Sequence, residues 1–318
     1  MSDTRALSSL ALMAVNAAES AAIAASAWIG RGEKESADQA AVDALRNGLN
    51  AMPMRGRIVI GEGERDEAPM LFIGEEVGTG EGPEIDIALD PLEGTTLTAW
   101  GMNNALVVVS FSPRGGLLNA PDTYMDKIAI GPGMPTGVID IDASPQDNVI
   151  NLARAKGVSP SEITVCVLER ERHQYIVDGV KAVGGRVRLI SDGDVAGIMG
   201  AAGLGTGVDM YIGRGGAPEG VLAASALRCI GGQMQARLFF RTDDERERAR
   251  RIGVTDLDRK YDLDGLASGH CLFVAAGVTE GDLVNGVRRA DGLVHTHTLV
   301  LDSADLSVRR VRSARPED

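Results

Sequence analysis

Hydrophobic side chains recur along the chain at two spacings, which predict helices in some segments and strands in others. Residues 6–29 carry their apolar side chains, from Leu7 to Trp28, on one helical stripe, so we expect an amphipathic helix there. Polar residues interrupt this Ala-rich run and no basic segment leads it, which argues against a signal peptide. We find no transmembrane segment elsewhere and expect a cytoplasmic protein that does not bind membranes.

A second helical stripe includes Ala41 and Leu45 and ends before Pro53. Ser36 has a Gln three residues later, which matches a capping box and predicts that the helix begins there. Asp38 would then lie in the first turn, where a carboxylate can simply stabilise the helix dipole.

Apolar runs in the first half of the chain predict four strands, at residues 57–60, 84–90, 104–111 and 126–130. Side chains alternate in the second of them, with Ile85, Ile87 and Leu89 on one face and Asp86 and Asp90 on the other. From about residue 143 helices and strands alternate, beginning with a helix at 144–156. Near the end we expect a buried strand at 270–278 and a closing hairpin around residues 303–305.

This order of elements predicts an α/β fold, in which helices pack on the faces of a sheet, and a division of the chain into two halves. The expected division is residues 1–150 and 151–318, with the boundary near residues 145–155.

Composition narrows the class of function. The 318 residues carry a formal net charge of −13, which repels a nucleic-acid backbone, so we expect no nucleic-acid partner. The three cysteines, Cys166, Cys229 and Cys271, are far apart and show neither zinc spacing nor a disulfide framework. We expect them to be buried thiols in a reducing cytosol.

Acidic residues gather where three predicted strands end, in GEGE (61–64), DPLEGTT (90–96) and GGAPEG (215–220). Pro91 lacks an N–H donor and is expected to end its strand, and Thr95 can cap a following helix. Asp90 and Glu93 would bring oxygen ligands of the kind that Mg²⁺ and Mn²⁺ prefer. Each motif can equally be a polar turn, and Glu219 can be a helix-dipole partner.

Two further strand ends carry ERERH (169–173) and SDGD (191–194). Arg170 and Arg172, two residues apart, can form a phosphate clamp or pair with acids on the surface. Strand ends in an open α/β sheet can converge on one crevice, so acids for a metal and arginines for a phosphate together suggest phosphoryl chemistry. A dinucleotide-binding site is less favoured, because GEGE lacks the third glycine and Glu62 would repel a pyrophosphate.

Longer segments carry a specific resemblance. WIGRGEKESAD, IVIGEGERDEAPMLFIGEEVGTG, DPLEGTT, LNAPDTYMDKIAIGPG, SDGDVA and GGAPEGV resemble class II fructose-1,6-bisphosphatases of bacteria, within the metal-dependent, lithium-sensitive sugar phosphatases. The resemblance extends from about residue 5 to 312. It implies a two-domain α/β fold of layered sheets and helices, with a metal-binding catalytic domain at 1–150 and a sugar- and phosphate-binding domain at 151–318. It also implies hydrolysis of the 1-phosphate of fructose 1,6-bisphosphate by a water activated by two or more Mg²⁺ or Mn²⁺ ions. The reaction would serve gluconeogenesis or Calvin-type carbon metabolism, and we expect a homodimer or homotetramer.

The resemblance also implies roles for individual residues. The metal ligands would be Asp38, Glu62, Asp90, Glu93 and Glu219, with the Leu92 carbonyl. Thr95, Glu62 and Asp90 would be catalytic, with Thr95 orienting or deprotonating the attacking water, and Glu64 would lie beside the metals. The substrate-binding residues would be Lys34, Glu93, Gly94, Thr95, Tyr124, Arg170, Arg172, His173, Asp192, Asp194 and Glu219. Arg170 stands where we expect Lys in the family, and the segment between Arg251 and His270 is shorter than in some members.

Four alternatives remain at this point. The enzyme could also accept sedoheptulose 1,7-bisphosphate, which shares the phosphate end. An inositol monophosphatase is less favoured, because Arg170 and Arg172 would have no second phosphate to bind. A cation-dependent sugar-phosphate sensor without activity and a nucleotide-binding oxidoreductase complete the set.

Overall fold

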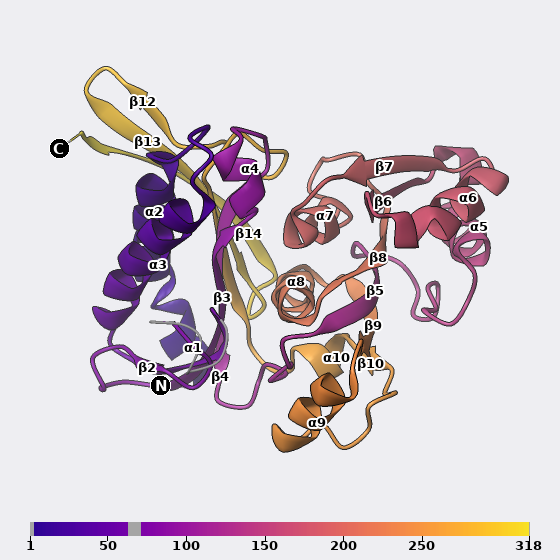
Figure 1. The fold of residues 1–318 in the computed structure, drawn as a ribbon, viewed down its shortest axis with the longest axis horizontal. Helices are drawn as coiled ribbons and strands as arrows, with labels where there is room; N and C mark the ends of the chain where they lie inside the picture. The colour runs from indigo at the N-terminus through magenta and orange to yellow at the C-terminus, as the bar shows by residue number, and fades with distance from the viewer. Residues whose placement is uncertain (1–2, 63–70, 318) are drawn as a thin grey trace. The chain divides into compact units, whose positions relative to one another are not determined.

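The computed structural model describes residues 3–62 and 71–317 of the chain, and these form two compact units. The first unit contains the chain up to Leu118 together with the segment from Ser268 onward, and the second is Asn119–Ala267 (Figure 1). Each unit is built on its own sheet with helices against it, which confirms the expected α/β fold of sheets and helices.

The sheet of the first unit has the order β12-β13-β11-β4-β3-β1-β2, with β14 paired to β13. Its strands are β1 (Arg55–Ile60), β2 (Glu76–Val77), β3 (Glu84–Glu93), β4 (Leu106–Pro113), β11 (Leu272–Gly277), β12 (Arg288–Ala290), β13 (Leu293–Asp302) and β14 (Ser307–Pro316). β1 and β3 are parallel neighbours, and the other strand pairs of this sheet, such as β3 with β4, are antiparallel.

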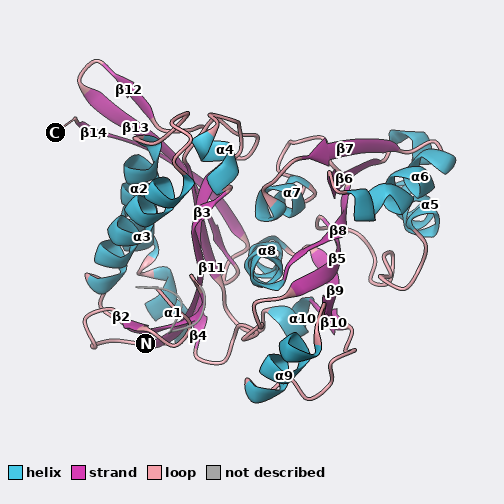
Figure 2. Cartoon of the chain, in the orientation of Figure 1, coloured by secondary structure: helices cyan, strands magenta, loops and turns pink. Residues whose placement is uncertain are grey.

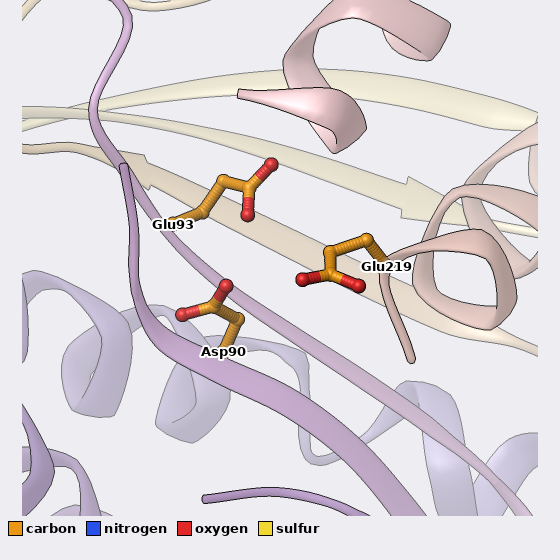
Figure 3. Close-up of side chains that lie close together, drawn as sticks. All are labelled: Asp90, Glu93 and Glu219. Carbon is orange, nitrogen blue, oxygen red and sulfur yellow. The ribbon is translucent and has the colours of Figure 1, made fainter. Parts of the chain in front are cut away.

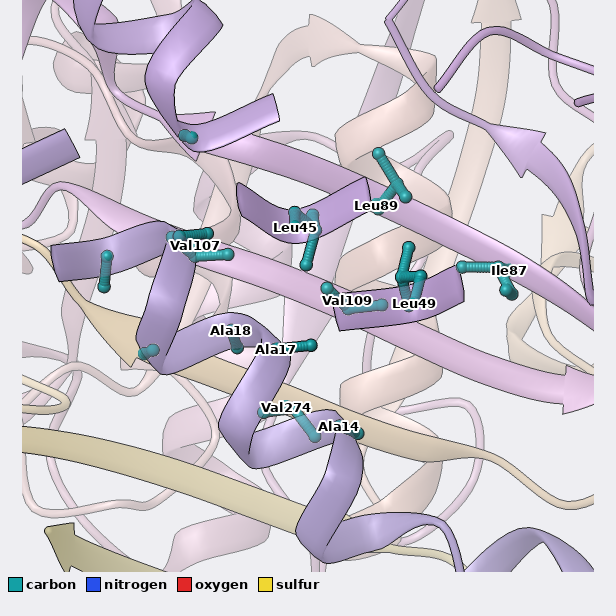
Figure 4. Packing of buried hydrophobic residues seen from close by; sticks show 14 of the residues in the cluster. Ala14, Ala17, Ala18, Leu45, Leu49, Ile87, Leu89, Val107, Val109 and Val274 are labelled. Carbon is teal, nitrogen blue, oxygen red and sulfur yellow. The ribbon is translucent and has the colours of Figure 1, made fainter. Parts of the chain in front are cut away.

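Helices pack on one face of this sheet: α1 (Asp3–Ser8), α2 (Ala11–Ser26), α3 (Lys34–Asn50) and the short α4 (Thr95–Ala99). The predicted helix at 6–29 is therefore two helices. The expected alternation in β3 is confirmed, because Ile87 and Leu89 are buried among side chains of α2 and α3 (Figure 4). The two helices lie so close that a Cβ on Gly48 would be 2.6 Å from the Cβ of Ala17.

The start of α3 differs from the prediction. The helix begins at Lys34, and its N-cap residue Glu33 makes no side-chain cap hydrogen bond. The capping box at Ser36 is therefore wrong, and Asp38 lies in the second turn. Tertiary contacts decide the start, because the N–H groups of Gly30 and Gly32 bond to carbonyls of α4 and fix the preceding turn.

The sheet of the second unit has the order β10-β9-β5-β8-β6-β7. Its strands are β5 (Tyr124–Ile130), β6 (Thr164–Leu168), β7 (Arg186–Ile190), β8 (Met210–Gly216), β9 (Gln233–Phe239) and β10 (Tyr261–Asp262). Its helices are α5 (Pro145–Lys156), α6 (Gln174–Ala182), α7 (Asp194–Gly200), α8 (Ala217–Ile230), α9 (Asp243–Arg251) and α10 (Leu263–Leu266), with 3-10 turns at Pro160–Glu162 and Glu171–His173. Within this unit α5 and α6 lie against one face of the sheet and α7 and α8 against the other (Figure 2).

The division into units differs from the expected boundary near residue 150, which falls inside α5. The predicted strand at 270–278 and the closing hairpin are both present, but β11 pairs with β4 and returns the end of the chain to the first sheet. Because β4 and β11 are far apart in the sequence, no local sequence pattern predicts that they pair. None of the helices in the described part of the chain is long and apolar enough to cross a membrane.

Candidate metal and phosphate sites

Asp90 and Glu93 stand at the end of β3 in the first unit. Residues three apart in a regular strand point to opposite faces, but the pairing with β4 shifts between them. Asp90 lies opposite Val108 and Glu93 opposite Leu106, so β3 contains one extra residue, a β-bulge. The bulge brings an oxygen of Asp90 and one of Glu93 within 4.8 Å of each other, and Figure 3 shows the two side chains directed toward each other.

Pro91 does not end the strand as expected but lies in this bulge, where a missing N–H donor is tolerated. The N–H of Leu92 donates to Oδ1 of Asp90 over 3.0 Å, which fixes the orientation of that carboxylate. Leu92 is itself buried.

Gly94 turns the chain from β3 into α4. Its φ of 91° is in the left-handed region, and a Cβ there would lie 2.7 Å from Cδ1 of Leu97, so glycine is required for two reasons. Thr95 is the first residue of α4 and not its cap. The half-buried Thr95 therefore follows the two carboxylates directly, and its hydroxyl is not used in capping.

Helix α3 contributes Lys34 and Asp38, which lie one turn apart on the same side. Nζ of Lys34 donates a 2.8 Å hydrogen bond to Oγ1 of Thr96, so this part of α3 adjoins the start of α4. Burial raises the pKa of Asp38 to about 6. A half-buried carboxyl with this pKa is unusual for a plain dipole partner and suits a position that a cation would occupy.

Glu62 follows β1, the parallel neighbour of β3, so it stands at the same edge of the sheet as Asp90. It is half-buried, and its N–H bonds to the carbonyl of Leu71 over 3.0 Å. The expected neighbour Glu64 lies outside the described residues.

In the second unit, Glu219 lies in the first turn of α8. Burial raises the pKa of Glu219. The Lys127 ammonium opposes this rise, and the nearby Asp194 carboxylate adds to it. Its Oε2 is buried and accepts no hydrogen bond from the described residues. An orphaned buried carboxylate oxygen is costly unless a cation or donor satisfies it.

Asp194 is not exposed as a free sugar-binding group. It is buried, and its two oxygens accept from Nζ of Lys127 and from the hydroxyl of Tyr211. Lys127 also donates to the carbonyl of Gly216 over 2.7 Å, just before α8. Sequence reasoning missed Lys127, which is only 1% exposed. The available signal was its place in β5, on the same face as the apolar Met125.

Tyr124 lies at the start of β5, with two guanidinium groups near its ring. Arg172 stands 5.1 Å and Arg241 4.9 Å from the ring centroid. Arg172 also donates to the carbonyl of Arg214 over 2.9 Å and is otherwise exposed. Tyr124 and Arg172, both predicted substrate contacts, are therefore neighbours.

The other predicted contacts of this unit differ in their surroundings. Arg170 is exposed, and its Nη1 donates to the carbonyls of Glu169 and Ser191. His173 is buried: Nδ1 donates to the carbonyl of Leu168 over 2.8 Å, and Nε2 accepts from the N–H of Arg214 over 2.9 Å. Burial lowers the pKa of His173, so the ring is neutral and both nitrogens serve the backbone. Asp192 is half-buried at the turn before α7.

Comparison with known proteins gives consistent matches over nearly the whole chain. The family described as "Bacterial fructose-1,6-bisphosphatase, glpX-encoded" matches residues 8–315. A protein of Synechococcus sp. (strain JA-2-3B'a(2-13)), named "D-fructose 1,6-bisphosphatase class 2/sedoheptulose 1,7-bisphosphatase", is 43% identical over 97% of this chain and 96% of its own. A protein of the same name from Microcystis aeruginosa (strain NIES-843 / IAM M-2473) is 44% identical, covering 96% and 95%.

Among solved structures, an inositol monophosphatase from Anabaena (Nostoc) sp. PCC 7120 is similar over 68% of this chain and 79% of that one, at 14% identity. Its TM-score of 0.36 is too low for the likeness to carry weight.

Proposed function

We propose that this chain, which belongs to the family of bacterial, glpX-encoded fructose-1,6-bisphosphatases, releases the 1-phosphate of fructose 1,6-bisphosphate as inorganic phosphate. It is a phosphatase, and its sugar product would be fructose 6-phosphate. The observation that carries the proposal is the pair of carboxylates at the β3 bulge, Asp90 and Glu93, followed directly by the Thr95 hydroxyl.

We further propose that Mg²⁺ or Mn²⁺ ions are held by Asp38, Glu62, Asp90, Glu93 and Glu219, with the Leu92 carbonyl. The donor set fits such ions, because it consists of oxygens alone. Two carboxylates as near as those of Asp90 and Glu93 repel each other without a cation, and Glu219 has a buried oxygen that no described residue hydrogen-bonds. When bound, the ions would supply Lewis-acid stabilisation of the phosphate oxygens and of the charge on the leaving sugar oxygen.

The chain's own residues would orient and deprotonate the nucleophile. Thr95 would hold the attacking water through its hydroxyl, and Asp90 or Glu62 would accept the proton that the water loses. Water attacks phosphorus, the bond to the sugar oxygen breaks, and that oxygen leaves and takes up a proton. Lys34, beside Thr96, and the backbone at Gly94 would contact the phosphate.

Residues of the second unit would hold the sugar and its distal phosphate. Arg172 and Tyr124 suit this role, because an exposed guanidinium beside an aromatic ring can bind a phosphate in a fixed orientation. Arg170, His173, Asp192 and Asp194 remain proposed members of this region. The bonds of His173 and Asp194 within the protein indicate that these two position neighbours.

Sedoheptulose 1,7-bisphosphate is a compatible second substrate, since the names of the relatives from Synechococcus and Microcystis contain both activities. We propose that the protein acts in the cytoplasm, where its three buried cysteines would stay reduced, as a homodimer or homotetramer.

A phosphate-release panel tests the proposed function. The substrates are fructose 1,6-bisphosphate, sedoheptulose 1,7-bisphosphate and inositol 1-phosphate, with Mg²⁺ or Mn²⁺, with and without Li⁺. We expect release from the first substrate with fructose 6-phosphate as product. Thr95→Ala and Glu219→Gln should lower the rate by about 10²-fold or more, and Thr95→Ser, which keeps the hydroxyl, should retain most of it. Release from inositol 1-phosphate alone would overturn the assignment.

A further inference from the structure

A cavity of about 320 Å³ in the first unit lies at β12, β13 and β14, away from the carboxylates of β3. In the sheet, β11 and β4 separate β13 from β3, which corresponds to about 14 Å at the usual strand spacing. The cavity is lined by Arg288, His295, His297 and Arg312, with Glu280 and Asn285 from the segment between β11 and β12. None of these residues has a role in the proposed reaction.

The strand register places the four basic side chains on one face of the sheet. Arg288 lies directly opposite His295, and Arg312 lies directly opposite His297. Residues that face each other across two strands share a side of the sheet, and so do residues two apart in one strand. The pairing of the strands therefore brings the side chains of the two arginines and the two histidines together at the cavity.

His297 presents a buried donor that pairs with none of the described residues. The backbone N–H of Asn285 donates to Nδ1 of His297 over 3.0 Å, so that nitrogen is an acceptor and carries no proton. The side-chain Oδ1 of Asn285 also lies 3.0 Å from Nδ1. Because Nδ1 already accepts from the Asn285 N–H, two acceptors would meet there, so the amide is assigned with its NH₂ group toward the ring.

The remaining ring nitrogen of His297 then carries the proton. Burial lowers the pKa of His297, and the Arg312 and Arg310 guanidinium groups lower it further. Glu280 opposes this effect. The ring is therefore neutral. A neutral imidazole with an accepting Nδ1 has its proton on Nε2. His297 is 7% exposed, and its Nε2 has no hydrogen-bond partner in the part of the chain that the structure describes.

Arg288 and Arg312 form no ion pair with the described residues, although the chain as a whole is acidic. Neighbouring arginines on β12 and β14 behave differently: Arg289 pairs with Glu317, and Arg315 pairs with Glu19. Guanidinium groups on one face of a sheet without a counter-charge repel each other, and a bound anion would relieve that repulsion.

We infer that this cavity binds a small phosphate-bearing anion, with Arg288 and Arg312 on its oxygens and the Nε2–H of His297 as a buried donor. The cavity is at the lower end of the size range of small-molecule sites, which excludes large ligands. Among the described residues that line it, Glu280 is the one acid, so an anion with more than one negative charge is still favoured over a cation.

The test uses the four histidines of the full chain, observed by NMR through their ring carbon-bound protons, while inorganic phosphate is added to the Mg²⁺-loaded protein. Chloride at equal ionic strength is the salt control. His270, whose ring pairs with Asp302, is the internal reference, and His173 reports on the second unit. We expect saturable shifts of His295 and His297 at millimolar phosphate, and none with chloride.

The double variant R288Q/R312Q should weaken this response by about tenfold or more. R309Q is the control, because it also removes an arginine charge from β14 but at a residue that pairs with Asp305 and does not line the cavity. This variant should leave the response unchanged. Both variants should release phosphate from fructose 1,6-bisphosphate at the wild-type rate. Unshifted His295 and His297 resonances at millimolar phosphate, or equal responses in wild type and R288Q/R312Q, would overturn the inference. Loss of turnover would bear on the proposed function instead.

Discussion

Asp90 and Glu93 carry carboxylate oxygens within 4.8 Å of each other because a bulge in β3 inserts one residue between them. Without the bulge the two side chains would project from opposite faces of the sheet. The arrangement places two like charges together at a strand end that is partly closed to water. Such a pair is unfavourable by itself and becomes favourable when a divalent cation is bound between the carboxylates.

The replacement Asp90→Asn should separate function from stability. Removing one of two repelling carboxylates should leave the metal-free protein at least as stable, and activity should fall by about 10²-fold or more. Phosphate release and urea unfolding in EDTA measure the two effects.

Asp86 in the same strand is the matched control. It is buried and accepts bonds from Arg57 and from the N–H of Gly115. Asp86→Asn should lower the free energy of unfolding by about 2–4 kcal/mol. This is less than the loss expected when a fully buried ion pair is broken, because Arg57 is partly exposed. If Asp90→Asn proves the more destabilising of the two, Asp90 is a structural and not a metal-binding residue.

Asp38 gives a pH dependence with a defined sign. Its pKa of about 6 exceeds the usual value near 3.9 for an unfolded chain. Between about pH 4 and 6 the folded metal-free protein therefore binds more protons, so this contribution to its stability falls as pH rises through that window.

The same proton competes with a cation at Asp38. Affinity for Mn²⁺ should fall as pH drops below about 6 and level off above it. Calorimetric titrations with Mn²⁺ across this range measure the effect, and Asp38→Asn should weaken binding while removing this part of the pH dependence. An affinity in the wild type that is independent of pH from about 5 to 8 would exclude Asp38 as a ligand.

Lys127 and Asp194 form a buried ion pair in the second unit. Lys127→Met would leave a buried carboxylate with only the Tyr211 hydroxyl, and we expect a loss of about 3–5 kcal/mol in the free energy of unfolding. The double variant Lys127→Met/Asp194→Asn should recover part of that loss, since it removes the unpaired charge. Urea unfolding of the three proteins tests this coupling, and equal losses in the single and double variants would disprove it.

Arg172 and Arg170 should differ in their effect on substrate binding. Arg172→Gln removes an exposed guanidinium beside Tyr124 and should raise KM for fructose 1,6-bisphosphate by about 10- to 100-fold, with a smaller change in kcat. Arg170→Lys should change KM less, because Arg170 already bonds to two backbone carbonyls. Steady-state kinetics would contradict this if Arg170→Lys had the larger effect.

Local patterns predicted the elements that bring the carboxylates to strand ends. The alternation of β3 and the strand that precedes GEGE, β1, follow from their apolar patterns alone. The β3 bulge was not predicted, because Pro91 reads locally as the end of a strand. Ser36 was misread as a cap because the chain before α3 is held by α4.

Two other features could not be read from local sequence. The return of β11–β14 to the first sheet depends on pairings across the whole second unit. Lys127 can be buried because its partners, the Asp194 carboxylate and the Gly216 carbonyl, come from distant segments. A lysine in a strand otherwise suggests an exposed edge. The site residues themselves were predicted from the family resemblance. Asp38 as a metal ligand and Thr95 as a catalytic residue could not be predicted from their positions in the chain alone.

The central claim is that cations held by these carboxylates drive the hydrolysis of fructose 1,6-bisphosphate. The most direct measurement is formation of fructose 6-phosphate by chelator-treated protein as Mn²⁺ is added back, with Asp90→Asn in parallel. We predict no turnover without the metal, saturable recovery in the wild type and at most about a hundredth of that rate in the variant. Equal turnover in EDTA and in Mn²⁺, or full recovery in Asp90→Asn, would contradict the account.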